Sequence, residues 1–139
     1  NFQNILIGKG KILKKGKKIA FLNLGTRLKK VLEINEMIKN HHKINCTVVD
    51  MRFAKPIDAK LIQNLNKTHD IFITIEENAI GGFSSQVNDL LINKLNKTPK
   101  ILNFFMKDEF IDQSDIDDQY NKSGISKELI FDKISTLLK

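Results

Sequence analysis

The stretch that decides the fold is ITIEENAIGGFSSQV, residues 73–87. An apolar run of β-branched residues ends in two adjacent carboxylates, Glu76 and Glu77. A glycine pair, Gly81 and Gly82, then precedes a segment whose apolar residues follow helical spacing. β-Branched residues favour strands, and glycine permits the tight backbone that joins a strand to a helix. The stretch therefore predicts a strand and a helix, with carboxylates at the strand end, where open α/β sheets usually place their sites.

Short strand-like runs alternate with longer helical runs on both sides of this unit. The predicted strands are residues 19–24, 46–51, 70–75 and 100–105. The predicted helices follow Gly25, Asp58, Gly82 and Ser126, and the one after Gly82 extends to Leu95. This alternation is typical of βαβ units. We predict an α/β fold, a three-layer α/β/α sandwich with a mostly parallel sheet of four or five strands.

The length suits one domain, which we place at residues 1–139. Residues 1–17 are expected to form an extended arm, in which residues 4–13 could be an edge strand, and residues 18–139 the α/β core. The chain begins with Asn1 rather than Met. We therefore expect a processed start or, more readily, a piece of a longer protein.

Polar residues and glycines mark the expected helix ends. Thr26, Asp58 and Ser126 each precede an apolar helical pattern and are predicted N-caps. A short acidic turn is expected at residues 114–120, and Gly124 is the expected stop before the last helix.

The net charge of +7 raises the question of a nucleic-acid partner. The charge comes from 21 Lys and only two Arg, spread in pairs without any recognition motif. We expect a solvated lysine-rich surface and no nucleic-acid partner. The single cysteine, Cys46, lies in an apolar run and is predicted to be a buried, inert thiol. No apolar run approaches the length of a membrane span, so we expect a soluble, intracellular chain without a membrane partner.

Gly25, Thr26 and Arg27 follow the first core strand and could hold a phosphate or carboxylate at a helix N-terminus. A tight turn with a cap and an exposed arginine is the other interpretation, and the sequence favours it. No nucleotide-binding fingerprint accompanies these residues.

Two further stretches follow predicted strands. Asp50 and Arg52 are two residues apart, so they share one face of a strand and are expected to pair. Glu76 and Glu77 point to opposite faces and need separate partners; one of them is expected to contact the free amides of the helix after Gly82.

These residues do not complete a catalytic set. His41, His42 and His69 fall at predicted helix ends, where surface positions are expected, and no histidine lies near the three strand-end stretches in sequence. No spacing of ligands suggests a metal site. We therefore predict no catalytic, cofactor-binding or metal-binding residue, and treat the strand-end residues as candidate interdomain or anion contacts: Gly25, Thr26, Arg27, Arg52, Glu76, Glu77, Gly81 and Gly82.

Four stretches together resemble the carboxyl-terminal domain of the 1-deoxy-D-xylulose-5-phosphate synthase family, which is transketolase-like. They are GKGKIL at 8–13, LGT at 24–26, VDMRFAKPID at 49–58 and TIEENAIGGF at 74–83. Transketolases and the beta subunits of 2-oxoacid dehydrogenases share part of this outline and remain alternatives, as does a stand-alone anion-binding module. The chain departs from the family at residues 105–111, where a proline usually precedes the aspartate.

The resemblance implies a full-length homodimeric transferase that condenses pyruvate with glyceraldehyde 3-phosphate, with loss of carbon dioxide, on thiamine diphosphate and Mg²⁺. Its product feeds isoprenoid, thiamine and pyridoxal precursors. The family's cofactor and catalytic motifs belong to two preceding domains and are absent from this sequence. The resemblance thus implies an inactive structural domain that supports the dimer, contacts the preceding domains and a second copy, and lies in a bacterial cytoplasm or a plastid.

Overall fold

A computed structural model describes residues 4–139, so residues 1–3 of the expected arm lie outside the described part. Five strands form one sheet in the order β1-β3-β2-β4-β5. They are β1 (Lys11–Lys14), β2 (Lys18–Asn23), β3 (Thr47–Asp50), β4 (His69–Ile75) and β5 (Lys100–Phe104). The last four run parallel, whereas β1 pairs antiparallel with β3 at one edge. The prediction of a mostly parallel sheet is confirmed. The arm supplies an edge strand, but this strand covers Lys11–Lys14 and not residues 4–13.

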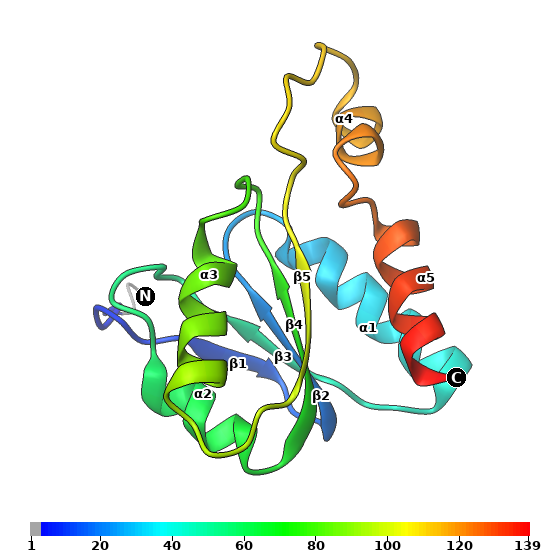
Figure 1. Cartoon of the computed structure of the whole chain (residues 1–139). Helices are drawn as coiled ribbons and strands as arrows, with labels where there is room; N and C mark the ends of the chain where they lie inside the picture. Colours follow the sequence, from blue (N-terminus) through cyan, green and yellow to red (C-terminus); the bar gives the residue numbers. More distant parts are fainter. Residues whose placement is uncertain (1–3) are drawn as a thin grey trace.

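Helices cover both faces of this sheet (Figure 1). One face carries α1 (Leu28–His42) and α5 (Lys127–Leu138), and the other carries α2 (Ala59–Asn66) and α3 (Phe83–Asn88). A short π-helical turn, η1 (Asp89–Asn93), extends α3. The remaining helix, α4 (Ile116–Lys122), lies beyond the carboxyl ends of the strands (Figure 1). The predicted three layers are therefore present.

The central strands explain why their sequences are almost continuously apolar. In β2, Ile19 and Phe21 pack toward α1 and α5, whereas Ala20 and Leu22 pack toward α2 and α3. All four are fully buried. Successive side chains of a strand point to opposite faces, so a sheet covered on both faces needs apolar residues at every position.

Two of the three predicted N-caps are confirmed. The Asp58 carboxylate accepts a hydrogen bond from the Leu61 amide at 3.1 Å, and the Ser126 hydroxyl accepts one from the Leu129 amide at 3.4 Å. Thr26 is not a cap, because the chain makes a turn after Gly25, which has a left-handed φ of +91°, and α1 begins one residue later with Arg27 in the cap position.

Other helix ends differ slightly from the sequence prediction. The helix after Gly82 ends at Asn93, in a π-helical turn, and does not reach Leu95. The expected acidic turn is the helix α4, and Gly124, with a φ of +82°, separates it from α5 as predicted. No helix within residues 4–139 is long and apolar enough to span a bilayer.

His69 corrects a prediction. The sequence placed it at the surface, but it starts β4 and is only 3% exposed. Its Nδ1 lies 3.0 Å from the Leu65 carbonyl and 3.0 Å from the Thr68 hydroxyl, and its Nε2 lies 2.8 Å from the Thr47 hydroxyl. These polar partners make burial of the ring possible. Leu65 and Thr68 are close to His69 in the sequence, but Thr47 on β3 is 22 positions away, and no local pattern suggests that contact.

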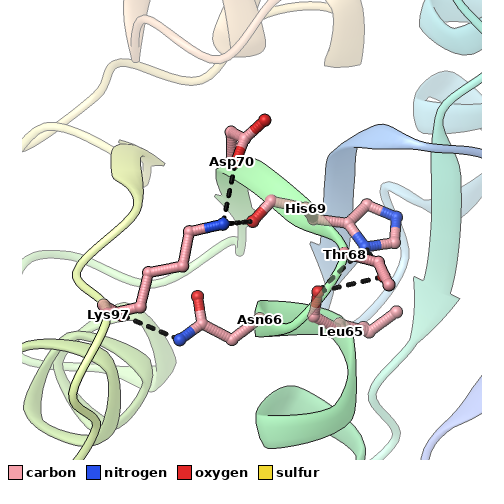
Figure 2. Close-up of polar contacts among 6 residues, drawn as sticks. All are labelled: Leu65, Asn66, Thr68, His69, Asp70 and Lys97. Atoms are coloured by element: carbon pink, nitrogen blue, oxygen red, sulfur yellow. Dashed lines mark hydrogen bonds and ion pairs between the residues drawn. The ribbon is translucent and has the colours of Figure 1, made fainter.

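The segment before β5 is tied to the same region, as Figure 2 shows. Lys97 Nζ donates to the His69 carbonyl at 3.3 Å and to Asp70 at 2.8 Å, and Asn66 donates to the Lys97 carbonyl at 2.8 Å. These contacts join α2, β4 and the 94–99 segment at the amino end of β4, opposite the end where the candidate site lies.

Candidate functional site at the carboxyl edge of the sheet

The carboxyl ends of three parallel strands bring the candidate residues to one edge. Asn23 of β2 is in register with Asp50 of β3 and with Ile75 of β4. The segments that follow these three residues therefore begin at the same level of the sheet. These segments contain Gly25, Arg52 and Glu76. The three residues therefore lie at the carboxyl edge of the sheet, where open α/β sheets place their sites.

Glu76 is the buried anchor of this edge. It is 1% exposed, and its carboxylate accepts hydrogen bonds from the amides of Phe83 and Ser84, both at 2.7 Å. These amides belong to the first turn of α3, which has no intrahelical acceptor for them. The predicted contact between a strand-end carboxylate and the helix after Gly82 is confirmed, and Glu76 is the residue that makes it.

The glycine pair allows this contact. A Cβ atom on Gly82 would overlap Glu76 Oε2 and would lie 2.8 Å from Asn78 Nδ2. Gly81 has a φ of +100°, a conformation that other residues rarely adopt. The two glycines therefore have different roles, since Gly82 gives the carboxylate space and Gly81 gives the backbone its direction.

Glu77 points away from Glu76 and has its own partner, as predicted. It accepts a hydrogen bond from the hydroxyl of Tyr120 on α4. The same tyrosine ring lies against the guanidinium of Arg27, whose Cζ is 3.6 Å from the ring centroid. Glu77, Tyr120 and Arg27 thus connect the end of β4, the helix α4 and the start of α1.

Arg27 does not lie beside Gly25 at the sheet edge. Its side chain is 5% exposed, and Nη2 donates to the Ile125 carbonyl at 3.1 Å. Gly25 and Thr26 are exposed, and Gly25 lines a hollow at the sheet edge that Arg27 does not reach. The expected alternative of an exposed arginine is wrong.

Asp50 and Arg52 pair as predicted. The Arg52 amide donates to Asp50 Oδ1 at 3.2 Å, and Arg52 Nε lies 3.6 Å from Oδ2. Arg52 has a φ of +60°, which is uncommon for a residue with a side chain. The Asp50 carboxylate stabilises the turn that follows β3 by contacts with the amide and the side chain of Arg52.

A hollow of about 460 Å³ opens at this edge. Five of the eight predicted strand-end residues line it, whereas Thr26, Arg27 and Arg52 do not. The full lining is Leu24, Gly25, Ala54, Lys55, Glu76, Glu77, Asn78, Gly81, Gly82, Phe83 and Gln86. Sequence reasoning did not single out Lys55 or Tyr120. Lys55 stands within a quoted motif, but Tyr120 lies 43 residues from Glu77 and gave no local signal.

The chemistry available here is limited to contacts. Both oxygens of Glu76 are engaged by amides, and no histidine lines the hollow. Within residues 4–139, no three His, Cys, Asp or Glu side chains come together in a group that could hold a metal ion. The arrangement can position a loop and present a surface with one cation and one carboxylate, Lys55 and Glu77.

Comparisons with known proteins place these features in a family. Residues 8–130 match the family described as "Transketolase, C-terminal domain". A 1-deoxy-D-xylulose-5-phosphate synthase of Haemophilus influenzae is 43% identical over 129 residues, which cover 92% of this chain and 20% of that protein. The enzyme of the same description from Psychromonas ingrahamii is 40% identical over 132 residues, with 91% and 20% coverage. The chain thus spans about a fifth of the length of these relatives.

Solved structures agree with the fold. One described as "Split gene transketolase, inactive beta4 tetramer" superposes with a TM-score of 0.87 at 28% identity, over 98% of this chain and 44% of that chain. A transketolase of Campylobacter jejuni superposes with a TM-score of 0.60 at 16% identity, over 93% of this chain and 18% of that one. The second likeness shows the fold alone.

Proposed function

The chain belongs to the family of transketolase C-terminal domains, and from this premise we propose that it is the carboxyl-terminal domain of a 1-deoxy-D-xylulose-5-phosphate synthase. The observation that carries the proposal is the 40–43% identity to synthases of that description over about nine-tenths of the chain. The complete enzyme would condense pyruvate with glyceraldehyde 3-phosphate, with loss of carbon dioxide, and so supply isoprenoid precursors. Its bacterial relatives favour a bacterial cytoplasm over a plastid.

Thiamine diphosphate and Mg²⁺ would supply the carbon–carbon chemistry of the complete enzyme. The residues of this chain do not fit them, because Glu76 is committed to two amides and the described residues offer no cluster of metal ligands. We therefore assign the cofactor to the proposed preceding domains, and the isolated chain is expected to be inactive.

The role of this domain would be structural. The loop of residues 76–82 is anchored internally by Glu76 but leaves Ile80 68% exposed. Beside it, a hollow of about 530 Å³ is lined in part by Ala79, Met106, Phe110 and Ile111, and Phe110 is fully exposed. Exposed apolar side chains grouped near one edge are a feature of interaction surfaces. We assign this surface to contact with the preceding domains of the same chain, within a homodimer.

Substitution of Ile80 in the complete enzyme tests this role. Ile80→Asp puts a charge on the exposed loop without removing any buried contact, and should weaken the dimer in sedimentation analysis or lower the temperature of unfolding. The matched control is Ile92→Asp, because Ile92 is 53% exposed on η1, away from this loop. Dimerisation, stability and turnover that are all unchanged in Ile80→Asp would show that the loop has no interface role.

A transketolase is the second candidate, favoured by the TM-score of 0.87 with the split-gene protein. The two activities differ in their donor substrate. An assay of the complete enzyme separates them. Release of carbon dioxide from pyruvate would support the synthase, whereas transfer of a two-carbon unit between sugar phosphates without that release would support the transketolase.

A further inference from the structure

A second apolar segment, separate from the loop of residues 76–82, lies in the arm before β1. Its three consecutive side chains, Ile5, Leu6 and Ile7, are 61%, 68% and 76% exposed. A single exposed apolar residue is ordinary on a protein surface, but several adjacent ones form a patch of the kind found at interaction sites. These three residues are therefore a candidate contact segment.

Polar contacts fix the residues that follow this segment. The Gly10 amide donates to Asp58 Oδ2 at 3.2 Å, and Lys9 Nζ lies 3.4 Å from Asp58 Oδ1. Asp58 is only 6% exposed, and it also caps α2 through the Leu61 amide. One buried carboxylate thus joins the arm to the start of a helix.

Close approach of the backbone adds to this attachment. Gly8 has a φ of +69°, and a Cβ atom on it would lie 2.8 Å from Cγ of Pro56. A Cβ atom on Gly10 would lie 3.0 Å from Leu61 Cδ2 and 3.3 Å from the Asp50 carbonyl oxygen. The arm therefore lies directly on the segment between β3 and α2 (Figure 1).

The arm is thus held in place without burial of its three apolar side chains. The Lys9 amide donates to the Leu6 carbonyl at 3.2 Å, so the held part reaches into the backbone of the apolar segment. A surface that is fixed before binding loses less conformational entropy when a partner covers it. Residues 5–7 therefore combine exposed apolar side chains with a position that neighbouring contacts set in advance.

The lengths of the relatives indicate the partner. The family of C-terminal domains matches from residue 8 onward, so the apolar segment lies just outside the matched domain. The match to this chain covers only 20% of each synthase relative, so most of such an enzyme lies in other domains. A segment at the boundary of the matched domain is within immediate reach of the domain that precedes it.

We propose that Ile5, Leu6 and Ile7 dock on an apolar surface of the domain that immediately precedes them in the complete enzyme. The contacts of Asp58 with Lys9 and Gly10 fix the direction from which the segment reaches that surface. Burial of the three side chains supplies the hydrophobic free energy of the contact. The inference rests on the proposed function for the existence of the preceding domain.

Thiol labelling measures this contact, because Cys46 is the only cysteine of the chain and is 1% exposed. Leu6→Cys introduces an accessible thiol, and Ile92→Cys, at a residue 53% exposed on η1, is the matched control. Both variants are prepared in the 139-residue chain and in the complete enzyme, and mass spectrometry follows the peptide that carries the new thiol.

The two thiols should respond differently to the presence of the other domains. Leu6→Cys is expected to react about tenfold more slowly in the complete enzyme than in the 139-residue chain, because labelling of a docked residue requires a local opening. Ile92→Cys should react at the same rate in both. Equal rates for Leu6→Cys in the two proteins would overturn the proposal.

Asp58→Asn tests how the segment is held. Asparagine is as good an N-cap as aspartate, so α2 keeps its cap, but the Gly10 amide loses its acceptor and Lys9 its opposite charge. Added to Leu6→Cys in the complete enzyme, this substitution should increase the labelling rate. An unchanged rate would show that the Asp58 contacts do not position the segment.

Carbon dioxide release from pyruvate, measured on the same complete enzyme, separates this proposal from the proposed function. Release together with unprotected Leu6→Cys rejects the contact and leaves the synthase assignment in place. Protection of Leu6→Cys without that release supports the contact and rejects the synthase assignment.

Discussion

The guanidinium of Arg27 lies 3.6 Å from the ring centroid of Tyr120, whose hydroxyl donates a hydrogen bond to Glu77. One tyrosine therefore joins a buried cation at the start of α1 to a carboxylate at the end of β4. Because Tyr120 belongs to α4, which lies beyond the sheet edge, this pair of contacts holds α4 on the rest of the domain (Figure 1).

Removal of the tyrosine hydroxyl should therefore destabilise the domain. Tyr120→Phe keeps the ring over Arg27 but leaves Glu77 without its donor, and we expect a loss of about 1–2 kcal/mol in the free energy of unfolding. Urea unfolding followed by circular dichroism measures it. Glu77→Gln retains an acceptor and should cost less. An unchanged urea midpoint in Tyr120→Phe would mean that the hydrogen bond contributes nothing in solution.

Glu76→Gln should cost more than Glu77→Gln. Glu76 is buried and uses both oxygens as acceptors from amides, so the glutamine NH₂ group would face an amide N–H. We expect a destabilisation of about 2–4 kcal/mol, because a buried donor then loses its acceptor. Thermal unfolding of the two variants side by side provides the comparison, and the reverse order would contradict the assigned role of Glu76.

The two glycines of the 76–82 loop should respond differently to alanine. Gly82→Ala places a methyl group on the Glu76 carboxylate and should cost about 2–4 kcal/mol. In Gly81→Ala, no atom of the described residues other than those of Gly81 and its two chain neighbours lies within 4 Å of the new Cβ. Only the left-handed backbone is therefore strained, and a cost of about 1–2 kcal/mol is expected. Chemical denaturation of both variants tests this ranking.

The thiol of Cys46 should be unreactive in the folded protein. Burial raises the pKa of this thiol to about 12, so almost no thiolate forms at pH 8. A thiol-specific reagent at pH 8 is expected to label the chain only after denaturant is added. Labelling of the native chain at the rate of the denatured one would show that the site opens freely.

The ion pair between Glu33 and Lys127 predicts a pH dependence. The hydrogen bond from Lys127 lowers the pKa of Glu33 below its usual value of 4.5. The unfolded chain therefore binds the proton more readily, and the pair stabilises the fold above about pH 4.5 but loses this effect as the pH falls through the lowered pKa. The stability difference between the wild type and Glu33→Gln should shrink below pH 4.5. Because both side chains are partly exposed to solvent, the difference is expected to be small, and a difference that grows in acid would contradict it.

Contacts between residues close in the chain were predictable from the sequence. The pairing of Asp50 with Arg52, the capping by Asp58 and the contact of Glu76 with the start of α3 all join residues two to eight positions apart. Local geometry limits the partners at such distances, so residue type and spacing are enough.

Contacts across the fold were not predictable in this way. Thr26 fits the residue preferences of an N-cap, but the turn after Gly25 moves the helix start to the next residue. His69 and Arg27 carry polar groups that suggest the surface, yet both are buried against partners in other elements. Burial of a polar side chain depends on whether distant segments supply its hydrogen bonds.

The sequence by itself determined the order of the four parallel strands and of the four helices that cover the sheet, its mostly parallel character and the family, because apolar periodicity and short motifs are local properties of a chain. Only the tertiary structure decided which side chains meet. It turned Arg27 away from Gly25 and toward Tyr120, and it placed the starts of α1 and α5 at one pocket. The hydrogen bond from Arg27 to the Ile125 carbonyl joins residues 98 positions apart, and no local sequence pattern indicates a contact over such a separation.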